Sequence, residues 1–303
     1  MIMENRLFKI CIYSLFIITL GQSCWNKTDK NQTATKSKSN AIKKVLLIAY
    51  DGCRTDALLA ANTPAIDSLF EHSYISLHCN IGTYAASIPS YSTILHGVWA
   101  NKHGLTKNKF DNSKYNEYPD LFYYLRKARP NLFLASISNW EDFLNITTEE
   151  NYTQSVRRDE NVKEKAICLL DSCPTDVLLL HFDQIDNVGH ISGFSATNPD
   201  YMTTIEDCDK FTGEIMKKIK LREQTKNEEW MVILTADHGG VDRSHEEDAN
   251  DANVRYVFLS VRLPHQSRIN MNQVDNTAIM PTIMNYLEIK TEESWHLDGK
   301  SIF

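Results

Sequence analysis

The chain has 303 residues and carries 39 acidic against 32 basic side chains, so its formal net charge is −7. This balance argues against the nucleic-acid backbone as a general partner, and no specific nucleic-acid partner is expected. The length allows one large α/β domain or about two average domains, and a core of that size needs no disulfides. The seven cysteines form no CxxC pattern of a zinc finger or redox pair, although Cys168 and Cys173 could bridge.

The first residues have the pattern of an export signal. Arg6 and Lys9 precede an apolar run at residues 10–20, which is too short for a comfortable membrane span. The run ends at GQSC, where a small residue precedes Cys24 as in a bacterial lipoprotein cleavage site. We expect residues 1–24 to be a signal peptide and the protein to be periplasmic or cell-surface, with Cys24 as the candidate lipid anchor. The alternatives are a plain signal peptide cleaved nearby and an uncleaved anchor.

Residues 25–42 are predicted to be a flexible linker. The stretch is rich in Lys, Asn, Ser and Thr and has almost no apolar residues, so it has little to bury. With a lipid at Cys24 it would tether the protein to a membrane. The folded domain is expected to span residues 43–303.

Four apolar runs predict strands that are buried on both faces of a sheet. They lie at residues 45–50 (VLLIAY), 176–182 (DVLLLHF), 230–235 (WMVILT) and 256–261. Residues 132–137 predict a further strand, and the weaker alternation at residues 74–79 fits an edge strand. The predicted helices lie between them, at residues 63–70, 90–95, 120–128, 162–170, 199–220 and 275–287.

Strands that alternate with helices predict a doubly wound α/β fold. We expect a three-layer sandwich with a mostly parallel central sheet and helices on both faces. In such folds the functional site lies beyond the carboxyl ends of the strands. Three of the predicted strands are followed directly by residues of the metal-ligand type, and this convergence is the strongest functional signal in the chain.

The side chains after these three strands form a candidate metal site. Asp51 follows the first strand, Asp186 and His190 follow the second, and Asp237 and His238 follow the third. Asp186 and His190 are four residues apart, so one helical turn would place them on the same face. Two glycines after His238 permit a sharp turn that aims both neighbouring ligands at one ion. Taken singly, these residues also fit a turn, a helix cap or a surface histidine.

His245 is a further candidate ligand, because it lies in a polar loop that leaves the same edge as Asp237. The alternative is a solvated histidine in an acidic loop. His103, beside a glycine, is interpreted as a residue of a turn or one that supports the ligands. His181 and His296 are interpreted as structural.

The stretch at residues 83–108 carries a candidate nucleophile. Ser87 lies at the start of a predicted helix, and Pro89 suits the first helical turn, where its missing N–H costs nothing. The free N–H groups and the dipole of that turn favour an anion beside Ser87. A serine at this position is also a common helix N-cap, so the stretch alone leaves both interpretations open.

Assembled, these residues resemble the alkaline phosphatase superfamily, and most closely its type I phosphodiesterase/nucleotide pyrophosphatase group. The matching stretches are VLLIAYDGCRTD, NTPAIDSLF, SIPSYSTILHGVWANKHGLTKN, DQIDNVGH, ILTADHGG, NTAIMPTIMNYLEI and WHLDGKSI. They occur in the family's order and cover nearly all of residues 43–303. The resemblance implies an alkaline-phosphatase-like fold, with residues 43–303 as the catalytic domain.

The resemblance also implies two bound metal ions, usually zinc, with other divalent metals as the alternative. Carried over motif by motif, one ion would be held by Asp186, His190 and His245. The other would be held by Asp51, Asp237 and His238, together with the oxygen of Ser87.

Further roles follow from the same resemblance. Ser87 would be the nucleophile, where many phosphodiesterases have Thr, and Asn108 would hydrogen-bond a phosphoryl oxygen. His245 follows the DHG motif closely, as in shorter members, whereas nucleotide pyrophosphatases carry this histidine much further on. His265 and His296 are therefore alternatives for the third ligand.

The expected activity is hydrolysis of a small-molecule phosphate ester or diester through a phosphoserine at Ser87. A phosphomonoesterase of the same superfamily is the first alternative, but no Lys or Arg is identified for the third phosphate oxygen, which favours diesters. A sulfatase would need an Arg two residues after Pro89, where the chain has Tyr91. A non-catalytic binding protein is the remaining alternative, and the complete ligand set argues against it.

Overall fold

In the described part of the chain nine strands form one sheet, and the buried apolar residues of its central strands make the core. The computed structural model describes residues 41–245 and 249–303. Its strands are β1 (Ile42–Tyr50), β2 (Ser73–Asn80), β3 (Leu134–Ser138), β4 (Tyr152–Ser155), β5 (Val177–Phe182), β6 (Glu228–Ala236), β7 (Tyr256–Arg262), β8 (Ile269–Asn270) and β9 (Val274–Asp275). Every residue of β5 is buried, as are the last seven of β1 and of β6, so the predicted buried strands are confirmed.

The sheet is mostly parallel, as expected. Its order is β4-β3-β5-β1-β6-β7-β2-β8, with β9 also paired to β2. The five strands from β4 to β6 run parallel, whereas β7 is antiparallel to both β6 and β2. A strand that is buried on both faces has the same apolar pattern whether it lies parallel or antiparallel to its neighbours. The sequence therefore could not predict that β7 is antiparallel.

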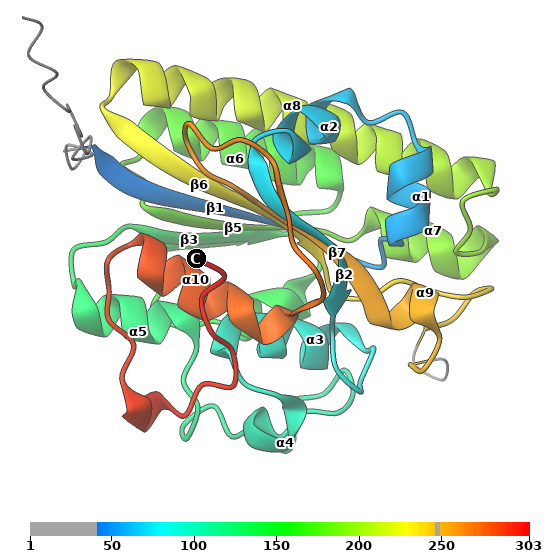
Figure 1. Cartoon of the computed structure of the whole chain (residues 1–303), viewed down its shortest axis with the longest axis horizontal. Helices are drawn as coiled ribbons and strands as arrows, with labels where there is room; N and C mark the ends of the chain where they lie inside the picture. Colours follow the sequence, from blue (N-terminus) through cyan, green and yellow to red (C-terminus); the bar gives the residue numbers. More distant parts are fainter. Residues whose placement is uncertain (1–40, 246–248) are drawn as a thin grey trace, which may run out of the picture. The chain divides into compact units, whose positions relative to one another are not determined.

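Helices cover both faces of the sheet, which confirms the three-layer architecture (Figure 1). One layer contains α2, α6 and α8, and the other contains α3, α5 and α10 (Figure 1). The helices are α1 (Thr55–Ala60), α2 (Pro64–Phe70), α3 (Ser87–His96), α4 (Ala100–His103), α5 (Leu121–Ala128), α6 (Asp159–Ser172), α7 (Gln184–Ser192), α8 (Pro199–Thr225), α9 (Ala252–Arg255) and α10 (Ile279–Tyr286). Short 3₁₀ turns lie at η1 (Glu141–Asn145), η2 (Asn276–Ala278) and η3 (Glu293–Trp295).

Local sequence signals explain where several helices begin. The Asp120 side chain accepts hydrogen bonds from the first-turn N–H groups of α5, and Asn198 does the same for α8, which continues with Pro199. The predicted helix at residues 275–287 is divided into η2 and α10. α3 starts at Ser87, three residues before the expected helical run.

The compact unit comprises Ala41–Phe303, and β1 begins at Ile42, one residue before the expected domain boundary. The predicted signal peptide, Cys24 and nearly all of the predicted linker lie outside the described residues. Within the part that is described, no helix has both the length and the apolar character that a membrane crossing requires. Cys168 and Cys173 are both free thiols, so the bridge considered from their spacing is absent.

Candidate metal centre

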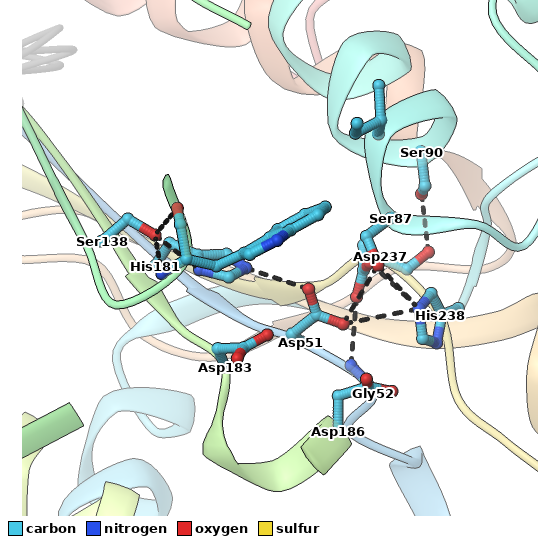
Figure 2. A network of polar contacts seen from close by, with 12 residues as sticks. Asp51, Gly52, Ser87, Ser90, Ser138, His181, Asp183, Asp186, Asp237 and His238 are labelled. Atoms are coloured by element: carbon cyan, nitrogen blue, oxygen red, sulfur yellow. Dashed lines mark hydrogen bonds and ion pairs between the residues drawn. The ribbon is translucent and has the colours of Figure 1, made fainter. Parts of the chain in front are cut away.

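The register of three neighbouring strands gathers the candidate ligands at one edge of the sheet. Tyr50, the last residue of β1, pairs with Phe182 of β5 and with Ala236 of β6. The residue after each strand is an aspartate, so Asp51, Asp183 and Asp237 emerge side by side. The backbone N–H of Gly52 donates to Oδ1 of Asp237 across 3.1 Å, which ties the turn after β1 to the turn after β6 (Figure 2).

Helix α7 brings Asp186 and His190 to the same place. Its i,i+4 geometry sets Oδ2 of Asp186 3.2 Å from Nε2 of His190. The helix packs so closely on the β1 turn that a Cβ on Gly52 would lie 2.6 Å from Oδ1 of Asp186. Gly52 also has a φ of +65°, so both the conformation and the contact require glycine there.

The two glycines after His238 serve packing rather than an unusual turn. Gly239 and Gly240 are not in left-handed conformations. A Cβ on Gly239 would lie 1.9 Å from the carbonyl oxygen of Asn253, and one on Gly240 would lie 2.3 Å from the ring of Phe194. The expectation of a glycine-dependent turn is therefore wrong, and the glycines let neighbouring segments approach the Asp237–His238 backbone.

His245 joins the same cluster from the loop after β6. Its Nε2 lies 3.2 Å from Nε2 of His190 and 3.9 Å from Oδ1 of Asp186. Its ring stacks on His238, with centroids 3.7 Å apart. The alternative of a solvated histidine does not describe this residue, since only 4% of it is exposed.

Three histidines present a lone pair to the centre of the cluster. Nδ1 of His190, His238 and His245 each lies 2.7–2.9 Å from a backbone carbonyl oxygen, of Arg243, Gly239 and Ala85 respectively. A carbonyl can only accept, so each Nδ1 carries the proton and each Nε2 has the lone pair with which a histidine binds a metal. The close Nε2 contact between His190 and His245 is then unfavourable without a cation between them.

The carboxylates also lack cationic partners. Oδ1 of Asp186 and Oδ2 of Asp237 are buried without a hydrogen-bond partner, although the latter lies 3.2 Å from Nε2 of His238. Among the described residues, no Lys or Arg pairs with Asp51, Asp186 or Asp237. Burial, and next the Asp186 charge, raise the pKa of Asp237 to about 7, and burial with Asp237 raises that of Asp51. This set of carboxylate oxygens and imidazole nitrogens fits a divalent metal such as zinc.

Among the described residues, three groups of possible ligands are close enough to share one ion each. Asp51, Asp237 and His238 have ligand atoms within 4.8 Å of one another, and so do Asp186, His238 and His245. His238 belongs to both of these groups, and Asp51, His181 and Asp183 form the third. His190 is in none of them and joins the cluster through its 3.2 Å contacts with Asp186 and His245. His265 and His296 are not in these groups.

Ser87 lies beside the first group, at the start of α3. Its Oγ is 3.4 Å from Oδ1 of Asp51 and 3.3 Å from Nε2 of His238 (Figure 2). The residue is the first of the helix, Ala86 is the N-cap, and no side chain caps that end. The N-cap interpretation of Ser87 is therefore wrong, and its hydroxyl is free to face the cluster.

Asn108 occupies one of the backbone donors that were expected to be free at the N-terminus of α3. Its Oδ1 accepts the backbone N–H of Ile88 across 2.9 Å, so this first-turn donor is already used. The same bond leaves the amide N–H groups of Asn108 as the donors that a ligand could meet.

A cavity of about 440 Å³ opens over the cluster, and Ser87, Asn108, Asp186, His190 and His245 are among the residues that line it. Arg243 lines it as well, with an exposed side chain that pairs with no carboxylate of the described residues. No Lys or Arg was predicted from the sequence for this place. Arg243 lies in an irregular polar loop, where no periodic pattern indicates which way a side chain points.

Other histidines have different surroundings. His103 is buried and lies 3.1 Å from Oγ1 of Thr93, so it supports helix α3. His181, which was interpreted as structural, contacts Asp51 directly, with its Nε2 2.9 Å from Oδ2. Burial lowers the pKa of His181 to about 3, so its ring is neutral. The position of a histidine within an otherwise apolar strand could have indicated this contact, because a buried polar side chain needs a hydrogen-bond partner.

Asp159, at the start of α6, anchors the turn between β5 and α7. Its carboxylate oxygens accept the backbone N–H groups of Asp183 and Gln184, each across 3.1 Å. The side chain is fully buried, and burial raises its pKa from 3.8 to about 7. Between pH values of about 4 and about 7 the carboxyl group is therefore protonated in the folded protein and ionised in the unfolded chain. Its contribution to the free energy of unfolding is lost as pH rises through this range.

Asp159→Asn removes this titration and keeps one acceptor for the turn. The free energy of unfolding is expected to fall less between pH 5 and pH 8 than in the wild type, by up to about 3 kcal/mol. Urea denaturation at the two pH values measures the difference, and all other titrating groups are shared by the two proteins. Equal falls in both proteins would contradict the buried-carboxyl explanation.

A family model and two curated relatives agree on the family of the chain. A family model described as type I phosphodiesterase/nucleotide pyrophosphatase matches residues 45–133 and 125–272. An uncharacterised pyrophosphatase/phosphodiesterase of Schizosaccharomyces pombe is 23% identical over 285 residues, which are 84% of this chain and 58% of that protein. Bis(5'-adenosyl)-triphosphatase ENPP4 of Pongo abelii is 22% identical over 267 residues, which are 82% of this chain and 57% of that protein. The chain spans less than three-fifths of either relative.

Solved structures share the fold. Mouse ectonucleotide pyrophosphatase/phosphodiesterase 5 has a TM-score of 0.64 at 14% identity, over 82% of this chain and 96% of that one. An inactive variant of the mouse protein has been solved in complex with AMP, with a TM-score of 0.61, 15% identity and the same coverage. A candidate sulfatase of Bacteroides thetaiotaomicron has a TM-score of 0.71 at 14% identity, over 86% of this chain and 73% of that one. At such identities the likeness shows the fold alone.

Proposed function

Because the chain belongs to the type I phosphodiesterase/nucleotide pyrophosphatase family, we propose that it is a metal-dependent hydrolase that cleaves phosphodiesters through Ser87. The observation that carries the proposal is the place of the Ser87 hydroxyl. It lies within 3.4 Å of two candidate metal ligands, Asp51 and His238, in a cavity that also contains Asn108.

We propose two zinc ions as the cofactors. Asp186, His190 and His245 would hold one, and Asp51, Asp237 and His238 would hold the other. Zinc at these ligands supplies a Lewis acid that lowers the pKa of a nearby hydroxyl group and offsets negative charge on phosphate. Three carboxylates and a serine alkoxide carry four negative charges, which two divalent ions balance.

The chain's own residues would carry out two displacements on phosphorus. Oγ of Ser87 gives its proton to water and forms a bond to phosphorus as the bond to the leaving alcohol oxygen breaks, and that oxygen takes a proton from the water in turn. A water oxygen then attacks the phosphoserine, the Oγ–phosphorus bond breaks, and Ser87 regains its proton. Asn108 would donate an amide N–H to a non-bridging phosphoryl oxygen in both steps.

A phosphomonoesterase is the second candidate, and Arg243 is the observation that favours it. A monoester has a third non-bridging oxygen and one more negative charge than a diester, so it gains more from a cation in the cavity. Arg243 is a cation in the required cavity. We still favour diesters, because Arg243 lies on an exposed loop and the cluster itself contains no Lys or Arg among the described residues.

A rate comparison tests both candidates on zinc-loaded protein. We expect an aryl phosphodiester to be cleaved faster than the aryl phosphomonoester. Arg243→Ala should lower kcat/KM for the monoester by about tenfold or more, the value of a charge-assisted hydrogen bond, and change the diester rate little. Arg157→Ala, at an exposed arginine that does not line this cavity, is the matched control. No cleavage of either ester would refute the proposed function, and a faster monoester would favour the phosphatase.

The remaining alternatives have less support. The sulfatase motif would need an arginine at Tyr91, whose ring is buried against Phe143 and His181. A binding protein without catalysis would not need a free hydroxyl within reach of the ligand cluster. We further propose export to the periplasm or cell surface through residues 1–24, with lipidation at Cys24 as the means of membrane attachment.

A further inference from the structure

His181 is a fully buried polar side chain next to the candidate metal centre. None of its surface is exposed. Its ring stacks on Phe143 at a centroid distance of 4.5 Å, and Tyr91 meets it edge-on at 5.0 Å. These contacts fix the plane of the imidazole, so its two nitrogens point in set directions.

The hydrogen bonds of His181 differ from those of the three candidate metal ligands. Its Nε2 lies 2.9 Å from Oδ2 of Asp51, and its Nδ1 lies 2.9 Å from Oγ of Ser138 (Figure 2). As a metal ligand Asp51 would be ionised, and an ionised carboxylate oxygen only accepts, so Nε2 would be the donor in the metal-bound protein. A hydroxyl, unlike a carbonyl, can donate to the unprotonated Nδ1. The Ser138 hydroxyl also donates to the carbonyl oxygen of Trp140 across 2.7 Å, so its single proton would be shared between that carbonyl and Nδ1 when Nε2 carries the ring proton.

The two oxygens of Asp51 therefore face different neighbours. Oδ2 accepts from His181, while Oδ1 lies 3.4 Å from both Oγ of Ser87 and Nε2 of His238. Figure 2 shows Asp51 between His181 on one side and the Ser87–His238 pair on the other. Rotation of the carboxylate would exchange these roles, and the bond to His181 prevents it.

We propose that His181 is a positioning residue: it holds the Asp51 carboxylate so that Oδ1 faces the metal ligand cluster and the Ser87 hydroxyl. The inference rests on the proposed function, since it assigns Asp51 to an ion. Groups that hydrogen-bond a metal ligand typically change metal affinity by about 10- to 100-fold when they are removed.

A pair of substitutions separates the hydrogen bond from the packing. His181→Phe keeps a flat ring between Phe143 and Tyr91 but has no donor. His181→Gln loses the ring but places an amide N–H close to the position of Nε2. We expect His181→Phe to weaken the binding of one zinc ion by about 10- to 100-fold. We expect His181→Gln to stay within a few-fold of the wild type.

The measurements are zinc affinity by competition with a chelator and zinc equivalents per chain by native mass spectrometry. His96→Phe is the matched control, because His96 is also buried and aromatic-stacked but bonds only backbone carbonyls. It should lower the melting temperature and leave zinc affinity unchanged. If His181→Phe does not fold, Ser138→Ala tests the same chain of hydrogen bonds with the ring retained, and weaker zinc binding is again expected.

Two results would overturn the inference. Unchanged zinc affinity in His181→Phe, or in Ser138→Ala if that variant replaces it, would reduce His181 to a packing role. His181, Asp51 and Asp183 also have ligand atoms within 4.8 Å of one another. A third zinc equivalent in the wild type that His181→Phe loses would therefore make His181 a ligand. Failure of the proposed function is distinguishable, because the wild type would then cleave no phosphoric ester whatever its zinc content.

Discussion

Ser87→Ala is expected to lower turnover of an aryl phosphodiester by about 10³-fold or more while leaving bound zinc unchanged. The physical reason is the division of labour in the site. Ser87 has the only side chain proposed to bond to phosphorus, whereas three carboxylates and three imidazoles are available to hold the ions. Turnover and zinc content, measured on the same preparation, check the prediction.

A matched control comes from the same helix. Ser92 is buried one turn further along α3, where its hydroxyl bonds the carbonyl oxygen of Ile88 rather than the ligand cluster. Ser92→Ala should keep turnover within a few-fold of the wild type. Acid quenching during turnover should also trap phosphate on the peptide that contains Ser87. Near-normal turnover in Ser87→Ala at equal zinc content would rule out the covalent route.

His245→Ala is expected to lose one of two zinc equivalents, and turnover should fall by more than about 100-fold. The substitution leaves Asp186 and His190 as the only other proposed ligands of that ion. The Nε2 atom that is removed lies 3.2 Å from that of His190, and the Ala85 carbonyl holds the ring in place through Nδ1. Zinc equivalents by native mass spectrometry give the direct measurement.

The other two histidines considered for this role serve as controls. His265 lines a different cavity, beside His72 and Lys217, and His296 follows η3. His265→Ala and His296→Ala should each retain two zinc ions and normal turnover. If His245→Ala keeps both ions and full activity, the third ligand of that site has been assigned wrongly.

The convergence of the candidate ligands at one edge of the sheet could be predicted from the sequence because it depends on buried strands. A strand that is apolar on both faces must lie inside a sheet, and parallel neighbours end at one edge. In the structure Tyr50 pairs with Phe182 and Ala236, so the three strands end level with one another. The neighbouring positions of Asp51 and Asp237 could therefore be predicted from the strand ends alone.

Other features depend on contacts that a linear pattern does not contain. The role of His181 depends on Phe143 and Asp51, which lie 38 and 130 positions away in the chain. Arg243 faces the cavity because of the path of an irregular loop. The position of Ser87 inside α3, rather than at its cap, depends on how the segment before the helix approaches the sheet.

The matched ends of β1, β5 and β6 have an energetic consequence for the protein without metal. Backbone hydrogen bonds fix these strand ends, so the carboxylates that follow them cannot move apart when no ion is present. Burial, and next the charges of neighbouring carboxylates, then disfavour the ionised forms of Asp51 and Asp237 in the folded state, and the pKa of each is raised. We therefore expect the candidate cation site to lower the free energy of unfolding of the metal-free protein, because its side chains are held in place before an ion binds.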